Sequence, residues 1–308
     1  MPKVSVIIPT YNCARYLPGA IESVLRQTYR DFEVIVVNDG SPDDTDSAVA
    51  PYLDRITYIK QANLGAPAAR NRGLAASTGE LIAFLDDDDE WVPEKLRLQV
   101  PEFDDAEVGL VYSDLRVVHD DGRVEESFLA TRPLAASGYI FENFLASGFI
   151  LTSCVAVSRR CLEDVGDFDE SMRSLQDFDL WFRILRRWKA ALVRRPLALR
   201  RLRAGNMTSD RNLPSRFYVR LYEKVLTEFE LSPRERAIAR SRMAEVCYER
   251  GYYLSHRGSR AEARSVLLRS LWYNARQLRA WRCLAVALAP TAIAARLRKS
   301  SATEAGRA

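Results

Sequence analysis

Four consecutive aspartates, at positions 86–89, directly follow an apolar segment at 81–85. The apolar run predicts a buried strand, so the carboxylates are expected at its C-terminal end. Like charges at this spacing repel one another, and removing a carboxylate from water raises its pKa unless a cation or donors compensate. A Mg²⁺ or Mn²⁺ ion, which prefers oxygen ligands and often bridges protein to substrate phosphates, would relieve the repulsion. A solvated acidic turn is the alternative interpretation.

Two upstream apolar segments, 4–8 and 32–37, also end in polar residues. Helical patterns separate the three predicted strands, which favours crossover connections and a mainly parallel sheet flanked by helices, in the α/β class. Such sheets bind their ligands at the carboxyl ends of the strands. The polar residues that follow the three strands should therefore line one crevice.

Asp177 begins a segment with helical periodicity, in which Phe178, Trp181, Phe182 and Leu185 form the apolar face. The helix dipole stabilises a carboxylate in the first turn of a helix. Capping is therefore the structural interpretation of Asp177, and catalysis is the functional one.

The composition of the 308 residues, 47% hydrophobic and 28% charged, is that of a folded soluble protein. No signal-peptide pattern occurs near the start, and no apolar run reaches about 18 residues without a charge or a proline. The five cysteines are scattered without ligand spacing and are expected to be reduced thiols. These features favour a cytoplasmic location.

The charges are distributed unevenly, because residues 1–180 hold 16 Lys+Arg and 32 Asp+Glu, whereas 181–308 hold 29 and 9. We therefore expect a first domain at 1–210 and a basic α-helical region at 211–308. Such a region is attracted to an anionic membrane surface or to a charged partner. Nucleic acid is not an expected partner, because the sequence has no recognition motif or basic patch interleaved with stacking aromatics.

Two interpretations concern the basic region. Residues 34 apart, such as Gly251 and Ala285, suggest tetratricopeptide-like helix pairs. The segment 281–298 mixes apolar residues with arginines, which fits an interfacial helix on anionic lipid and a peripheral position at the inner face of a membrane. An ordinary packing helix broken at Pro290 fits this segment equally well.

Together, these features resemble the family 2 glycosyltransferases, the inverting enzymes of the GT-A fold. Five segments carry the resemblance over about the first 205 residues: 4–12 (VSVIIPTYN), 37–41 (VNDGS), 63–73 (NLGAPAARNRG), 84–89 (FLDDDD) and 176–181 (QDFDLW). Each segment alone is a weak signal, whereas five in this order form a strong one. The resemblance implies a GT-A catalytic domain at 1–210.

The resemblance also implies roles for single residues. Pro9, Tyr11 and Asp39 would hold the base of a nucleotide-sugar donor, Asp88 would bind the metal and Asp177 would be the general base. The other donor-binding residues would be Asn12, Arg70, Asp86, Asp87 and Arg203. The physics is consistent with these roles, since a metal neutralises the leaving diphosphate and a positioned carboxylate deprotonates the acceptor hydroxyl. In-line attack then inverts the anomeric centre.

The sequence departs from the family pattern at two positions. Arg203 stands where members commonly carry a histidine, and an arginine cannot ligate a metal but can clamp phosphate. We therefore hypothesise that Arg203 contacts the diphosphate. Gln176 replaces the more usual glutamate before the base.

The expected function is metal-dependent transfer of a sugar from a UDP- or other NDP-sugar to a hydroxyl of a growing glycan, which would be free or lipid-linked, as in polysaccharide biosynthesis for the cell envelope. A sugar nucleotidyltransferase is an alternative, although its usual glycine-rich phosphate loop is missing at 9–12. A non-catalytic module that binds nucleotide sugars or glycans is another alternative. A dehydrogenase is disfavoured, because no G-x-G-x-x-G follows the first strand.

Overall fold

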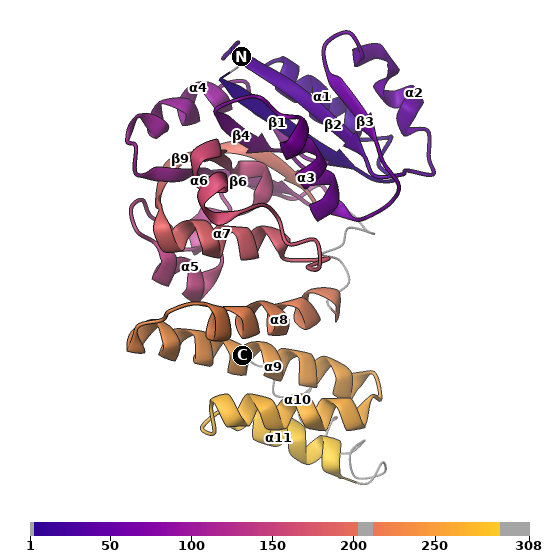
Figure 1. Cartoon of the computed structure of the whole chain (residues 1–308). Coiled ribbons are helices and arrows are strands. Elements are labelled where there is room, and N and C mark those ends of the chain that lie inside the picture. Colours follow the sequence, from indigo (N-terminus) through magenta and orange to yellow (C-terminus); the bar gives the residue numbers. More distant parts are fainter. Residues whose placement is uncertain (1–2, 203–211, 290–308) are drawn as a thin grey trace. The chain divides into compact units, whose positions relative to one another are not determined.

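Figure 1 shows the computed structural model of the chain, which describes residues 3–202 and 212–289. The chain divides into two compact units, Met1–Ser209 and Asp210–Ala308. The first unit combines one sheet with helices, and the second unit is helical in its described part. The roles expected for residues 1–210 and 211–308 stay predictions.

One sheet forms the centre of the first unit, with the strand order β3-β2-β1-β4-β8-β6-β9-β5 and with β7 paired to β6. The strands are β1 (Val4–Thr10), β2 (Phe32–Asn38), β3 (Thr57–Lys60), β4 (Leu81–Phe84), β5 (Glu90–Trp91), β6 (Val108–Val118), β7 (Val124–Glu125), β8 (Ala156–Ser158) and β9 (Lys189–Arg201). The first four strands are parallel, as the crossover pattern predicts. However, β8 runs antiparallel to β4 and β6, and β5 runs antiparallel to β9, so the whole sheet is mixed.

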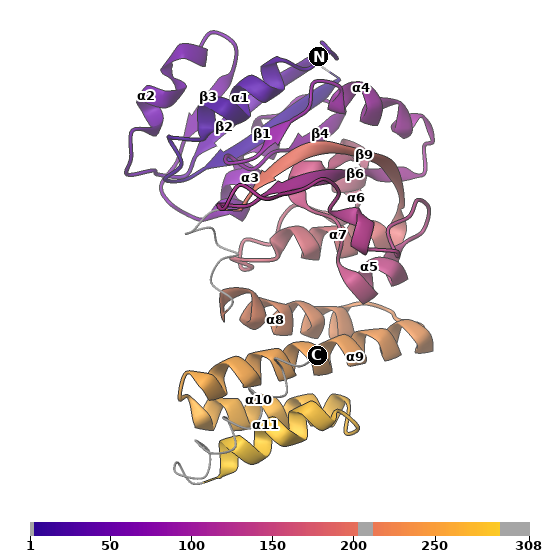
Figure 2. The ribbon, with the colours of Figure 1, turned by 180° about the vertical axis from the view of Figure 1, so that it is seen from behind.

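Helices cover both faces of the parallel strands (Figures 1 and 2). The helices of this unit are α1 (Leu17–Leu25), α2 (Thr45–Val49), α3 (Ala66–Ala76), α4 (Lys95–Gln99), α5 (Phe141–Ser147), α6 (Arg159–Val165) and α7 (Gln176–Arg187). On β2, Val34 and Val36 belong to the same buried cluster as Ile21 of α1. Ile35 of the same strand packs with Ala69 of α3. This burial on two faces explains the apolar run Val34–Val37 within the strand.

The aromatic face of α7 fixes the helix that carries Asp177. Phe178, Trp181, Phe182 and Leu185 are all buried, as the periodicity predicts. The ring centroid of Trp181 lies 6.2 Å from that of Phe84, the last residue of β4. The middle of α7 is thereby anchored to the strand that precedes the four aspartates.

The second unit contains α8 (Asn212–Glu228), α9 (Pro233–His256), α10 (Arg260–Tyr273) and α11 (Leu278–Leu288). Ser232 and Glu235 form a capping box that starts α9. A Cβ atom added to Gly251 of α9 would lie 2.5 Å from Cγ of Leu267 on α10, so glycine allows these helices to pack closely. The tetratricopeptide interpretation stays a prediction.

The described half of the segment 281–298 belongs to α11. Leu284 packs in a buried cluster with Leu267, whereas Trp281 and Leu288 are exposed. Pro290 and the residues after it lie outside the described part of the chain. Among the residues that the structure describes, no helix has the length and apolar character needed to span a bilayer.

Candidate active site

Polar residues from three strands meet at the carboxyl edge of the parallel strands. Thr10, at the end of β1, lies opposite Asn38 at the end of β2, and the amide of Asp39 donates a 2.9 Å hydrogen bond to the Thr10 carbonyl. The amide of Tyr11 donates to Oδ2 of Asp87, which follows β4, at 3.2 Å. The three polar clusters predicted to share a crevice are therefore joined by hydrogen bonds.

The turn after β1 presents an aromatic side chain to solvent. Pro9 is buried within the strand, whereas the side chain of Tyr11 is 50% exposed. Asn12 adopts the left-handed conformation (φ 53°), and its amide donates to Oγ of Ser41 at 3.1 Å. The turn is thus tied to the loop after β2 and leaves the Tyr11 ring available to a ligand.

Asp39 organises the loop that leads into α3. Its carboxylate is buried and accepts hydrogen bonds from Nε2 of Gln61 (2.8 Å) and from the amides of Leu64 (2.9 Å) and Gly65 (2.8 Å). Gly40 allows this loop to approach, because its φ is +71° and an added Cβ would lie 2.8 Å from the Asn63 amide nitrogen. Since a carboxylate has about four acceptor sites, little capacity remains for a ligand, and the predicted bond from Asp39 to a base stays a prediction.

The four aspartates after β4 differ in their environments. Asp86, Asp87 and Asp88 are partly exposed, whereas Asp89 is buried. Burial of the carboxylate raises the pKa of Asp87 to about 7, and the charges of Asp88 and Asp86 act in the same direction. The acidic segment is therefore not a uniformly solvated turn.

Asp89 turns into the protein and has a structural role that the sequence did not reveal. Its Oδ2 accepts from Oγ of Ser153 at 2.6 Å, and its Oδ1 accepts from the amide of Arg201 at 3.2 Å. Burial, followed by the charges of Asp86 and Asp88, raises the pKa of Asp89 well above its usual value. Asp89 thus joins the acidic segment to β9 and to Ser153.

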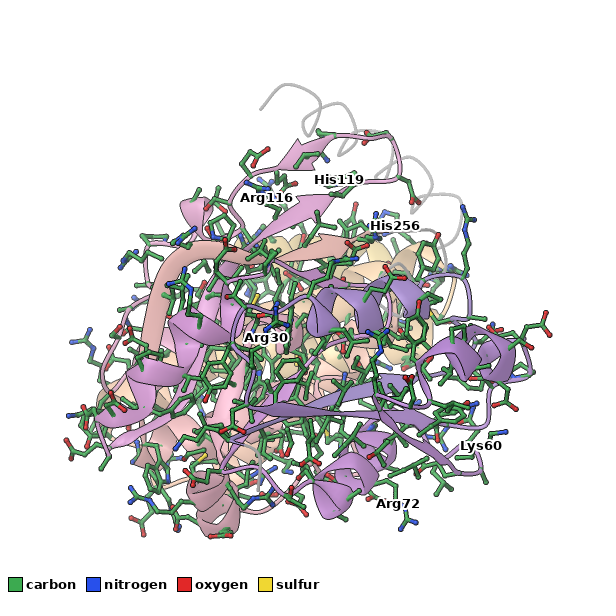
Figure 3. The ribbon with its side chains drawn as sticks, turned by 90° about the horizontal axis from the view of Figure 1, so that it is seen from above. Arg30, Lys60, Arg72, Arg116, His119 and His256 are labelled. Carbon is green, nitrogen blue, oxygen red and sulfur yellow. The ribbon has the colours of Figure 1, made fainter. Side chains whose placement is uncertain are left out.

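The two arginines of α3 lie on different sides of the helix. Arg72 is exposed and projects away from the protein in Figure 3, whereas Arg70 is buried. Nη2 of Arg70 donates to Oδ1 of Asp86 at 2.7 Å, and the guanidinium carbon lies 5.6 Å from the centroid of the Phe168 ring. Among the described residues, Nε and Nη1 of Arg70 have no hydrogen-bond partner. These buried donors can bind an anion.

Asp177 is the second residue of α7, and the cap position belongs to Leu175, whose φ is 60°. The Asp177 carboxylate is partly exposed and accepts from Oγ1 of Thr152 at 2.8 Å and from the amide of Phe178 at 2.9 Å. Burial raises its pKa, and the charge of Arg70 is the largest opposing influence. The positive charge of Arg70 therefore favours the ionised form of Asp177.

Two adjacent residues connect Asp177 to the acidic segment. Thr152 bonds to Asp177, and its neighbour Ser153 accepts from the amide of Asp86 at 3.2 Å while donating to Asp89. No periodicity or motif in the sequence marks Thr152 or Ser153, so this connection is visible only in the structure.

The structure describes only one of the two positions at which the sequence departs from the family pattern. Gln176 is buried, and its Oε1 has no hydrogen-bond partner among the described residues. Arg203 lies outside the described residues, so its proposed contact with a diphosphate stays a prediction.

The residues at the carboxyl edge of the parallel strands fit a divalent cation bound mainly through its substrate. Over residues 3–202 and 212–289, no group of three or more His, Cys, Asp or Glu side chains is arranged so that it could hold a metal ion. Mg²⁺ is commonly held by only one or two carboxylates, with substrate phosphates and waters as the other ligands. Asp86 and Asp88, which are partly exposed, can supply carboxylate oxygens of this kind.

Solved structures share this architecture. A mannosyltransferase from Pyrobaculum calidifontis, in complex with GDP-Man and Mn2+, superposes with a TM-score of 0.66 at 21% identity, over 98% of this chain and 80% of that one. S. aureus TarS 1-349 in complex with UDP-GlcNAc gives 0.67 at 19% identity, over 88% and 81%. At these identities the likeness establishes the fold, which is of the GT-A type and confirms the expected fold class.

The family follows from the sequence comparison. The family model described as Glycosyl transferase family 2 matches residues 5–166, so the chain belongs to that family, as the motifs predict. An uncharacterized glycosyltransferase of Rickettsia typhi is 35% identical over 194 residues, which are 60% of this chain and 59% of that protein. The chain spans only 32% of a relative from Rickettsia felis. The amylovoran biosynthesis glycosyltransferase AmsB of Erwinia amylovora is 27% identical over 87% of this chain and 96% of its own.

Proposed function

We propose that the protein is a metal-dependent inverting glycosyltransferase that moves a sugar from a nucleoside-diphosphate donor to a hydroxyl of a growing glycan. One observation carries the proposal: Thr152 holds Asp177, while its neighbour Ser153 holds Asp86 and Asp89. A carboxylate suited to proton abstraction is thus placed beside carboxylates suited to a metal and a diphosphate.

The donor would bind across the carboxyl edge of β1, β2 and β4. The exposed ring of Tyr11 can stack on a base, with Pro9, Asn12 and Asp39 shaping the same side of the crevice. Asp87, tied to the Tyr11 amide, would approach the ribose. A UDP-sugar or another NDP-sugar fits this role, and the neighbouring structures with UDP-GlcNAc and GDP-Man support a nucleotide-sugar donor.

Asp88, with Asp86 completing the D-x-D pattern, would hold Mg²⁺ or Mn²⁺. When bound, the ion would act as a Lewis acid that offsets the charge of the departing nucleoside diphosphate. Arg70 would also offset the charge of the diphosphate. One nitrogen of its buried guanidinium is paired with Asp86, and two further nitrogens are available as donors. Arg203 would clamp the same diphosphate.

Asp177 would accept the proton of the acceptor hydroxyl as that oxygen attacks the anomeric carbon. The bonds from Thr152 and the Phe178 amide orient its carboxylate. A raised pKa makes the carboxylate a better proton acceptor than a solvated aspartate, provided that it is ionised at the working pH. Attack from the face opposite the diphosphate inverts the anomeric centre without a covalent enzyme intermediate.

The acceptor would be a glycan, either free or lipid-linked, in polysaccharide synthesis for the cell envelope. The relative named for amylovoran biosynthesis supports a polysaccharide pathway. The basic region at 211–308 would hold a cytoplasmic enzyme at an anionic membrane surface, with Trp281 and Leu288 exposed on α11. Liposome flotation of the full chain and of a chain ending before residue 211 tests this location. Equal recovery of both chains in the soluble fraction would rule out binding to the membrane surface through residues 211–308.

Calorimetric titration with a panel of nucleoside diphosphates, with and without Mn²⁺, tests the proposal. The expected result is selective binding of one nucleotide that tightens with the metal. Incubation with the matching NDP-sugar and glycan acceptors should then release the nucleoside diphosphate and give an inverted product. Release of nucleoside triphosphate from NDP-sugar and pyrophosphate would instead identify a nucleotidyltransferase, and binding without turnover would identify a binding module.

A further inference from the structure

The second unit contains a cavity of about 330 Å³ that is lined only by residues of α8, α9 and α10. Figures 1 and 2 show these three helices packed in chain order. None of the lining residues belongs to the first unit. The volume is within the usual range for small-ligand sites, so the cavity can hold a phosphate and part of the group attached to it.

Arginine dominates the charge of this cavity. Its charged lining residues are Arg216, Arg220 and Glu223 from α8, Arg250 from α9, and Glu262 and Arg269 from α10. Four positive and two negative side chains leave a net charge of +2. The cavity thus favours a ligand with about two negative charges.

Ion pairs hold two of the arginines in place. Nη2 of Arg250 lies 2.5 Å from Oε1 of Glu262, and Nη2 of Arg269 lies 2.5 Å from Oε1 of Glu223. The Arg250 side chain is only 15% exposed. A guanidinium has five N–H donors in a planar fork, so an arginine anchored in this way can bind an anion with little loss of conformational freedom.

Arg216 and Arg220 complete the cavity from α8. They are four residues apart and therefore lie on the same face of the helix. Both are exposed. Buried Cys247 and partly exposed Val266 give the cavity an apolar wall.

We propose that this cavity is a binding site for a phosphoryl group. A phosphate monoester carries about 1.5 to 2 negative charges near pH 7 and has three strong acceptor oxygens, which matches the net charge and the arginine donors better than a single carboxylate would. The phosphoryl group would come from a soluble phosphate or diphosphate, or from a lipid headgroup. The site goes beyond the proposed transfer reaction, because none of its residues takes part in donor binding or proton transfer.

The test uses the full chain in EDTA, so that metal-dependent binding in the first unit does not contribute. One arm titrates inorganic phosphate and pyrophosphate by calorimetry, and the other measures flotation with phosphatidylcholine vesicles with and without phosphatidic acid. The variants are Arg216→Gln with Arg220→Gln, and separately Val266→Glu, which adds a carboxylate to the cavity. The charge-matched control is Arg257→Gln with Arg276→Gln, because both residues are exposed and outside the cavity.

Both cavity variants should bind at least about tenfold more weakly than the wild type, and the control should bind within about twofold. If the cavity variants bind more weakly in the calorimetric arm, the ligand is a soluble phosphate. If they bind more weakly only in the vesicle arm, the ligand is a lipid headgroup. Absence of binding in both arms, or equal binding by the wild type and both cavity variants, would overturn the proposal. Thermal unfolding of each variant verifies that the fold is retained.

Discussion

Oγ1 of Thr152 donates a 2.8 Å hydrogen bond to Oδ2 of Asp177. This bond stabilises the ionised carboxylate, and it is one of the influences that lower the pKa of Asp177 against the effect of burial. Thr152 is therefore placed to control both the direction and the protonation of the proposed base.

Replacing Thr152 by valine should raise the pKa of Asp177 further, because the valine side chain cannot donate. The base must be ionised to act, so activity rises with pH through this pKa, and the acidic limb of the kcat/KM profile should move to higher pH. Thr152→Ser keeps the hydroxyl and should restore the wild-type limb. A valine variant with an unchanged profile would show that the bond does not influence the reaction.

Arg70→Met should reduce transfer strongly, since it removes the buried cation beside Asp86 and the largest influence that lowers the pKa of Asp177. A hydrogen bond to a charged group contributes roughly 1.5–3 kcal/mol, and the free energy of unfolding should fall by about that amount. Arg72→Met, in the same helix but exposed, is the matched control and should change neither quantity. Urea unfolding and initial rates measure both effects, and equal behaviour of the two variants would contradict the assigned position of Arg70.

Chelation with EDTA should abolish transfer, and Mn²⁺ or Mg²⁺ should restore it. In Asp88→Asn, the affinity for the nucleoside diphosphate should lose its dependence on Mn²⁺, because the metal would be held by that carboxylate and the diphosphate together. Calorimetry with and without metal measures the difference. Full activity in EDTA would show that transfer does not depend on a metal bound by the acidic segment.

Lys95 offers a pH test of the fold that is independent of catalysis. It is fully buried over the Trp91 ring and donates to Gln99, and burial lowers its pKa to about 7. Between pH 7 and the ordinary lysine pKa of 10.5, the unfolded chain holds a proton that the folded protein has lost. The free energy of unfolding should therefore rise with pH across this range, by up to about 1.4 kcal/mol per pH unit.

Lys95→Met removes this titration and should give a flatter curve from pH 7 to 9. The comparison uses the slope, because the substitution also removes the donor to Gln99 and changes the absolute stability. Chemical unfolding at several pH values measures both curves. Parallel curves would show that Lys95 keeps its proton in the folded protein.

The sequence was sufficient to predict the parallel half of the sheet and the meeting of polar residues at its carboxyl edge. The runs at 4–8 and 32–37 are almost entirely apolar, with Ser5 and Glu33 as the polar exceptions, because helices cover both faces of β1 and β2. The antiparallel half of the sheet was harder to predict from the sequence, because β5 has only two residues and β8 has only three. In β9, Pro196 lies at a register shift against Asp114 of β6, and this irregularity hides the strand in the sequence.

Within the candidate site, the strand ends could be predicted but not the contacts between them. A run of four aspartates does not show that Asp89 points inward while Asp88 remains partly exposed. Thr152 and Ser153 lie far along the chain from both partners and carry no periodic signal. Their role follows only from the tertiary arrangement of the loop before β8 against β4 and α7.

The central claim is that Asp177 removes a proton in a crevice where a separate set of residues binds the donor. The most direct measurement pairs the single-turnover rate of Asp177→Asn with its donor affinity. We predict a rate at least about 10²-fold below that of the wild type, in the range typical for general bases, with donor affinity within about twofold. A variant that transfers sugar at the wild-type rate, or that loses transfer only because it no longer binds the donor, would contradict the claim.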